Sequence, residues 1–187
     1  MNTSLDVVAI VGSLRAGSLT RRVVVALTEM MRDTLTIEIV EIGALPLYNQ
    51  DSETAPPPTW SDFRSRIKRS DAVLFATPEY NRSVPGSLKN AIDVGSRPYG
   101  SSTWAGKPAA VLSVSPGSMG GFGANHHLRQ SLVFLDMPTL QQPEVYLGGA
   151  DNFLDEEGRI TSAPTQAFLL RFGRAFEAWI RRQTGTP

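Results

Sequence analysis

The chain has 187 residues, of which 41% are hydrophobic, and its 18 lysines and arginines balance 18 aspartates and glutamates. With a net charge of zero, the chain as a whole does not attract nucleic acid or an anionic membrane surface. Any anion must therefore be bound by a local site. The absence of cysteine excludes disulfides, thiolate metal sites and cysteine nucleophiles. No apolar run is long enough to cross a membrane, and the first residues do not resemble a secretion signal. We therefore expect a cytoplasmic protein with a single domain over residues 1–187.

Short apolar runs alternate with longer segments of helical periodicity, and no internal repeat is present. In chain order the pattern predicts a strand at 7–11, a helix at 19–31, a strand at 35–40, a helix at 60–69, a strand at 72–76, a helix at 86–94, a strand at 109–114, a helix at 128–135, a strand at 144–147 and a helix at 165–182. The proline-rich segment 46–58 is predicted to be a surface loop. Gly95 is expected to end the helix that precedes it.

Five strands separated by helices predict an α/β fold, with a doubly wound parallel sheet and helices on both faces. For a chain of this length the flavodoxin-like strand order 2-1-3-4-5 is favoured over the six-stranded dinucleotide fold. Ligands of such sheets bind beyond the carboxyl ends of the strands, at the point where the strand order reverses. The loops after the first, third and fourth strands are therefore the candidate binding loops.

The loop after the first strand reads VGSLRAGSLT and suits a single phosphate. Ser18 stands where a triphosphate-binding loop requires lysine, and Leu14 stands where the dinucleotide fingerprint requires its second glycine. Backbone N–H groups, the dipole of the following helix and the hydroxyls of Ser13, Ser18 and Thr20 remain as anion ligands. Arg15 adds a planar fork of donors. A simpler interpretation is also open, in which Ser18 only caps the helix and Arg15 is solvated.

The loops after the third and fourth strands carry further candidates. Pro78, Tyr80 and Asn81 offer a rigid wall, an aromatic ring and an amide that could contact a flat heteroaromatic ring. Three glycines in the segment 115–121 would let the backbone approach a ligand closely. Taken one at a time, these residues are equally typical of ordinary loops. Their coincidence at one edge of the sheet favours a site.

Four segments together resemble the NAD(P)H-dependent FMN reductase family, and in particular its quinone and chromate reductase branch: GSLRAGS, TPEYNRSVPGSLKNAIDVGSRP, WAGKPAAVLS and HHLRQSLVFLDM. The resemblance covers residues 7–144. It implies a flavodoxin-like enzyme that holds FMN noncovalently and takes hydride from NADPH or NADH. Its electrons would pass by a ping-pong mechanism to quinones, chromate, azo compounds or free flavin. No side chain is expected to act as a catalytic nucleophile or metal ligand, because the flavin carries the chemistry.

The resemblance also implies a set of cofactor-binding residues. They are Ser13, Arg15, Ser18, Leu19 and Thr20 around the FMN phosphate, Pro78, Glu79, Tyr80 and Asn81 along the isoalloxazine ring, and Ser115 and Gly117 opposite its pyrimidine end. Thr20 replaces the usual asparagine but keeps a hydroxyl donor. We interpret Glu79 as held by backbone contacts and not as a general base. N–H groups near Gly117 would stabilise negative charge on the reduced ring.

Several features leave alternatives open. Arg82, beside the expected ring site, could favour anionic acceptors or nicotinamide phosphates, or could simply be solvated. His126 and His127 are adjacent and would point to different sides of a helix, which favours structural or interface roles over a joint metal site. The expected partners are a small-molecule acceptor and further copies of the chain, in a homodimer or homotetramer. A flavodoxin-like electron carrier and a non-enzymatic flavin-binding regulatory protein are the alternative functions.

Overall fold

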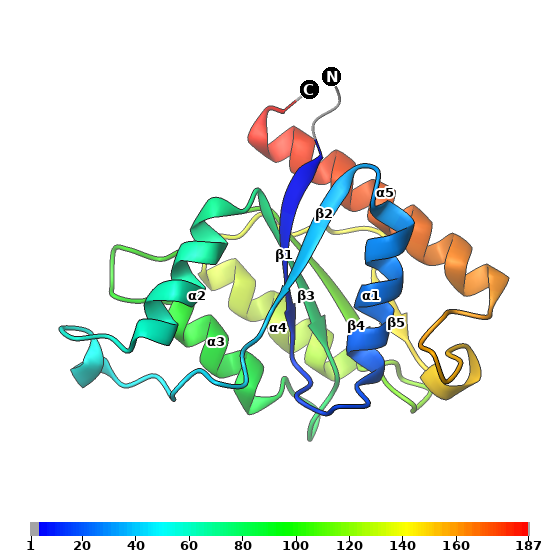
Figure 1. Cartoon of the computed structure of the whole chain (residues 1–187), viewed down its shortest axis with the longest axis horizontal. Coiled ribbons are helices and arrows are strands. Elements are labelled where there is room, and N and C mark those ends of the chain that lie inside the picture. The colour runs from blue at the N-terminus through cyan, green and yellow to red at the C-terminus, as the bar shows by residue number, and fades with distance from the viewer. Residues whose placement is uncertain (1–3, 187) are drawn as a thin grey trace.

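The computed structural model describes residues 4–186, and its centre is a five-stranded parallel sheet between two layers of helices (Figure 1). The strands are β1 (Leu5–Val11), β2 (Leu35–Val40), β3 (Ala72–Thr77), β4 (Ala109–Val114) and β5 (Val145–Leu147). They lie in the order β2-β1-β3-β4-β5, which confirms the predicted flavodoxin-like topology. The helices are α1 (Leu19–Met31), α2 (Pro58–Arg69), α3 (Gly86–Ser96), α4 (Phe122–Phe134) and α5 (Ala163–Thr184), with short 3₁₀ helices at Gln50–Ser52 and Ala150–Asn152.

The central strands are buried on both faces. Every residue of β3 and β4 is buried, which is why these segments read as continuous apolar runs without polar alternation. Helices α1 and α5 cover one face of the sheet, and α2, α3 and α4 cover the other (Figure 1). The buried side chains form one apolar cluster on each face. Because all five strands are parallel, the loops after β1, β3 and β4 meet at one edge, the lower edge in Figure 1.

The prediction that Gly95 ends its helix was wrong, because α3 continues through Ser96. A Cβ atom at Gly95 would lie 2.3 Å from Cζ2 of Trp104, so this glycine lets the fully buried indole pack directly on the helix. The indole Nε1 of Trp104 donates to the carbonyl of Ile92 at 2.9 Å. The helix ends where Arg97, which precedes a proline, adopts an extended conformation.

Helix α4 begins six residues earlier than the sequence pattern predicts. Gly121, with a φ of +77°, provides the left-handed residue from which the helix starts. The carboxylate of Glu79 accepts a hydrogen bond from the N–H of Ala124 at 3.1 Å. A side chain from the loop after β3 thus caps α4, and the two segments form one wall of the carboxyl edge.

Candidate active site

A hollow at the carboxyl edge of the sheet brings together three loops that lie far apart in the sequence. It is lined by Ser13, Arg15, Ser18, Leu19, Thr20, Pro78, Glu79, Tyr80, Val114, Ser115 and Pro116. Nine of the eleven predicted cofactor-binding residues are in this set, and the remaining two, Asn81 and Gly117, lie outside the lining. This is the place where the strand order reverses, as expected for a ligand site in such a sheet.

A second hollow adjoins the first. It is lined by Gly12, Leu14, Arg15, Tyr80, Pro85, Gly86 and Ser87, so Arg15 and Tyr80 belong to both. The predicted site residues include Arg15 and Tyr80 but none of the other five residues of this hollow, and they also lack Val114 and Pro116 of the first. Ser87 donates from Oγ to the carbonyl of Gly12 at 3.2 Å and ties the start of α3 to the loop after β1. Ser87 could have been predicted as a lining residue from its position in the first turn of the helix that follows the third strand.

Hydrogen bonds fix the backbone of the loop between β1 and α1. The N–H of Gly12 donates to the carbonyl of Ala76 at 2.8 Å, and the N–H of Ser18 donates to the carbonyl of Arg15 at 3.1 Å. Ser18 is the N-cap of α1, because its hydroxyl accepts from the N–H of Arg21 at 3.1 Å. The capping hydroxyl uses its oxygen in this bond and still has its proton to donate, so capping and anion binding are compatible.

Three residues of this loop have side-chain donor groups that bond to no other group within residues 4–186. The hydroxyls of Ser13 and Thr20 and the guanidinium of Arg15 all line the first hollow without a hydrogen bond or ion pair to the protein. Thr20 is only 2% exposed. The first N–H groups of α1 also have no acceptor within the helix, and the helix dipole favours an anion beside them. These groups form a donor set that fits a phosphate.

The loop between β3 and α3 supplies the opposite wall. Glu79, whose carboxylate caps α4, is engaged by a backbone N–H, in agreement with its predicted role. Tyr80 is 46% exposed and lines both hollows. Asn81 and Arg82 form the exposed tip of a tight turn beyond it, which explains why Asn81 does not line the hollow.

The loop after β4 contributes Ser115 to the hollow. Its hydroxyl accepts from the N–H of Gly117 at 3.0 Å, so this N–H is bonded within the loop. A contact between Gly117 and a ligand stays a prediction.

The two histidines of α4 have different neighbours. His126 Nε2 lies 3.0 Å from the hydroxyl of Tyr146, whereas His127 Nδ1 lies 2.8 Å from the hydroxyl of Ser83. Burial, together with the nearby Glu144 carboxylate, raises the pKa of Tyr146 to about 12, so the phenol stays protonated at neutral pH. The adjacent histidines thus support two different segments.

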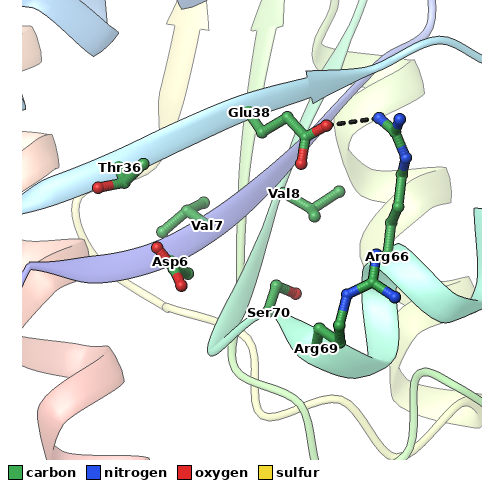
Figure 2. A pocket seen from close by; sticks show the side chains of 8 residues that line it. All are labelled: Asp6, Val7, Val8, Thr36, Glu38, Arg66, Arg69 and Ser70. Atoms are coloured by element: carbon green, nitrogen blue, oxygen red, sulfur yellow. Dashed lines mark hydrogen bonds and ion pairs between the residues drawn. The ribbon is translucent and has the colours of Figure 1, made fainter.

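Another hollow lies at the opposite, amino edge of the sheet. Figure 2 shows its lining, which consists of Asp6, Val7, Val8, Thr36, Glu38, Arg66, Arg69 and Ser70. The Arg66 guanidinium is paired with the Glu38 carboxylate, and Arg69 donates to the hydroxyl of Ser65 at 2.6 Å. Both arginines of this hollow are therefore satisfied by the protein itself.

Comparison with known proteins agrees with this geometry. The model of the NADPH-dependent FMN reductase family matches residues 5–152, which include the three loops of the carboxyl edge. The chain belongs to this family. It is an NAD(P)H-dependent flavoenzyme, with FMN as cofactor and a reduced nicotinamide as electron donor, and the predicted enzyme class is confirmed.

Relatives in the family match over nearly their whole length. A quinone reductase of Pseudomonas putida is 59% identical over 182 residues, which cover 97% of each chain. A 2-hydroxy-1,4-benzoquinone reductase of a Burkholderia species is 39% identical and covers 95% of this chain and 97% of its own. Among solved structures, FerB of Paracoccus denitrificans is a flavoenzyme NAD(P)H:acceptor oxidoreductase that is 39% identical to this chain. The two superpose with a TM-score of 0.91, over 96% of this chain and 98% of FerB.

Proposed function

We propose that this flavoenzyme reduces quinones with electrons from NAD(P)H, using FMN held at the carboxyl edge of the sheet. The observation that carries the proposal is the convergence of unpaired donors from Ser13, Arg15 and Thr20 on one hollow. Relatives that are named quinone reductases favour quinones over chromate, azo compounds and free flavin as the acceptor.

Each loop has a separate part in holding the cofactor. Arg15, the three hydroxyls and the first N–H groups of α1 bind the phosphate. Pro78 and Tyr80 lie along the ring system, and Ser115 faces its far end. The only carboxylate among the lining residues is that of Glu79, which accepts from the N–H of Ala124 and fixes the wall of the site.

The protein's contribution is binding and orientation. When bound, FMN supplies the redox chemistry, since it accepts hydride from the nicotinamide and passes electrons to the acceptor. This chemistry requires no amino-acid nucleophile, so the hydroxyls of the lining serve to bind the cofactor. Tyr80 lines both hollows and is 46% exposed, so solvent reaches the site on this side, and we propose that both substrates enter there. Nicotinamide and quinone would therefore use the same space in turn.

Steady-state kinetics of the FMN-loaded protein test this proposal. With NADPH varied at several fixed quinone concentrations, double-reciprocal lines should be parallel, because the oxidised nicotinamide leaves before the quinone enters. Intersecting lines would contradict the proposal that nicotinamide and quinone occupy the same place in turn. A protein that binds FMN but is not reduced by NADPH in anaerobic stopped-flow would be an electron carrier or a regulatory protein instead.

We also propose that the chain forms a homodimer or homotetramer in the cytoplasm. Val133 and Phe134, at the end of α4, are 77% and 89% exposed. Large apolar side chains exposed side by side on a surface favour contact with another protein chain. None of the helices within residues 4–186 has the length and hydropathy needed to cross a membrane. Sedimentation at micromolar concentration, with a Phe134→Lys variant for comparison, tests the assembly.

A further inference from the structure

The turn that follows β3 is unusually tight for its sequence. Tyr80 and Ser83 form an antiparallel bridge with two backbone hydrogen bonds, both of 3.0 Å. The two central residues, Asn81 and Arg82, have φ values of +50° and +65°. Positive φ at both central positions is the feature of a type I′ turn, whose usual sequence is Asn-Gly. Asn81 suits its position, whereas Arg82 stands where glycine is expected.

Packing against α4 holds this turn in place. A Cβ atom at Gly123 would lie 3.0 Å from the carbonyl oxygen of Arg82, so the turn sits directly on the first turn of the helix. Glu79 and Ser83, on the two sides of the turn, contact Ala124 and His127 of α4. The backbone of Arg82 is therefore fixed in the left-handed region, which disfavours any residue with a β-carbon.

The side chain of Arg82 is free to bind a ligand. It is exposed and makes no hydrogen bond or ion pair with any residue from 4 to 186. Arg64, Arg97 and Arg129 donate to carbonyl, carboxylate or amide oxygens of the protein. Arg174 and Arg182 on α5 are exposed and unpaired within residues 4–186 as well, so what distinguishes Arg82 is its left-handed backbone beside the hollows. Arg82 follows Tyr80, which lines both hollows, by two residues, so we place its side chain at their rim. An unpaired cation on a strained backbone at that position indicates a functional role for the cation.

We infer that Arg82 binds the 2′-phosphate of NADPH. This inference rests on the proposed function, because a reduced nicotinamide that enters the hollow beside Tyr80 must leave its adenosine half outside, across the rim that carries Arg82. A phosphate monoester carries nearly two charges at neutral pH, more than either phosphate of the diphosphate bridge that NADH also has. A guanidinium matches its oxygens in charge and geometry, so Arg82 selects NADPH over NADH.

The preference for NADPH over NADH, as the ratio of the two kcat/KM values with one quinone, tests this inference. Arg82→Gly removes the guanidinium and fits the positive φ, so the variant should fold, and the ratio should fall by about twofold to fivefold, as for an exposed guanidinium–phosphate pair. Arg82→Lys should keep part of the preference. Arg69→Gln removes the same charge at the opposite edge of the sheet and should leave the ratio unchanged.

A direct binding measurement separates this inference from the proposed function. In calorimetry with the FMN-loaded protein, Arg82→Gly should weaken the binding of adenosine 2′,5′-bisphosphate about twofold to fivefold more than that of adenosine 5′-monophosphate. An equal effect on both nucleotides, or an unchanged kcat/KM ratio, would overturn the assignment of Arg82. Failure of the unmodified protein to reduce any quinone with either nucleotide would instead overturn the proposed function.

Discussion

The two edges of the sheet carry arginines in opposite situations. At the amino edge, Arg66 is paired with Glu38 (Figure 2), and Arg69 donates to the hydroxyl of Ser65 in its own helix. At the carboxyl edge, Arg15 and Arg82 have no side-chain partner within residues 4–186. Both edges have a hollow and both have cations, so neither feature alone distinguishes a binding site. The donors that the protein leaves unsatisfied at the carboxyl edge support our proposal that FMN binds there.

The largest expected effect comes from removing the unpaired arginine of the phosphate loop. Arg15→Ala should weaken FMN binding by about 1.5–3 kcal/mol, the range for hydrogen bonds to charged groups. The matched variant Arg69→Ala removes a paired arginine from the amino edge and should leave FMN affinity unchanged. Fluorescence titration of the apoprotein with FMN measures both. Equal affinity in the two variants would remove the distinction between the edges.

Ser18 should affect both folding and binding, because its hydroxyl has a partner in the protein and faces the hollow. Ser18→Ala removes the N-cap of α1 and should lower the free energy of unfolding by about 1 kcal/mol. In a chain of this size that change corresponds to a Tm lower by about 2–4 °C. Thermal unfolding of the apoprotein checks this. An unchanged Tm would show that the cap has no role in stability.

Thr20 sharpens the comparison within the same loop, since its hydroxyl has no partner within residues 4–186. Thr20→Val should therefore weaken FMN by about 0.5–1.5 kcal/mol, the net value of one hydrogen bond. The stability of the apoprotein should not fall, because no internal bond is lost. Titration and thermal unfolding of the same sample provide both values. Lower apoprotein stability with unchanged FMN affinity would assign the hydroxyl to the fold.

A paired carboxylate should affect stability against acid and leave FMN binding unchanged. Glu53 accepts from Tyr48 at 2.7 Å and from Arg97 at 2.9 Å, and these bonds, with that of Tyr48 foremost, lower the pKa of Glu53. A lowered pKa in the folded state contributes stability above the unfolded-state value of about 4.3, and this contribution is lost as the pH falls through the folded-state value.

The Glu53→Gln variant tests this linkage. Its free energy of unfolding should fall less steeply than that of the unmodified protein between about pH 5 and 3. Urea unfolding at a series of pH values provides the two slopes, and a titration at pH 7 should give the same FMN affinity for both proteins. Identical slopes would mean that the Glu53 bonds do not persist in solution.

The sheet and most of the lining of the first hollow could be predicted because they depend on local patterns. The buried strands are continuous runs of apolar residues, and ligands of parallel sheets bind where those runs end. That rule identified the loops of Ser13, Pro78 and Ser115, and the resemblance in sequence refined the individual residues. The unsatisfied donors of Arg15 and Thr20 became evident only from the three-dimensional contacts.

The features that could not be predicted depend on contacts between distant segments. The first turns of α4, in FGANHH, lack an apolar stripe and are capped by Glu79, 45 residues away in the sequence. Gly95 reads as a helix stop until Trp104 is seen to pack against it. The positive φ of Arg82 breaks the local preference for glycine and follows from the packing of the turn on Gly123.

A crystal structure of the FMN-loaded protein tests the central claim most directly. The account predicts the phosphate of FMN within hydrogen-bonding distance of the Arg15 guanidinium and the hydroxyls of Ser13 and Thr20, at the start of α1. A phosphate bound elsewhere, for example beside Arg66 and Arg69 at the amino edge, would contradict it.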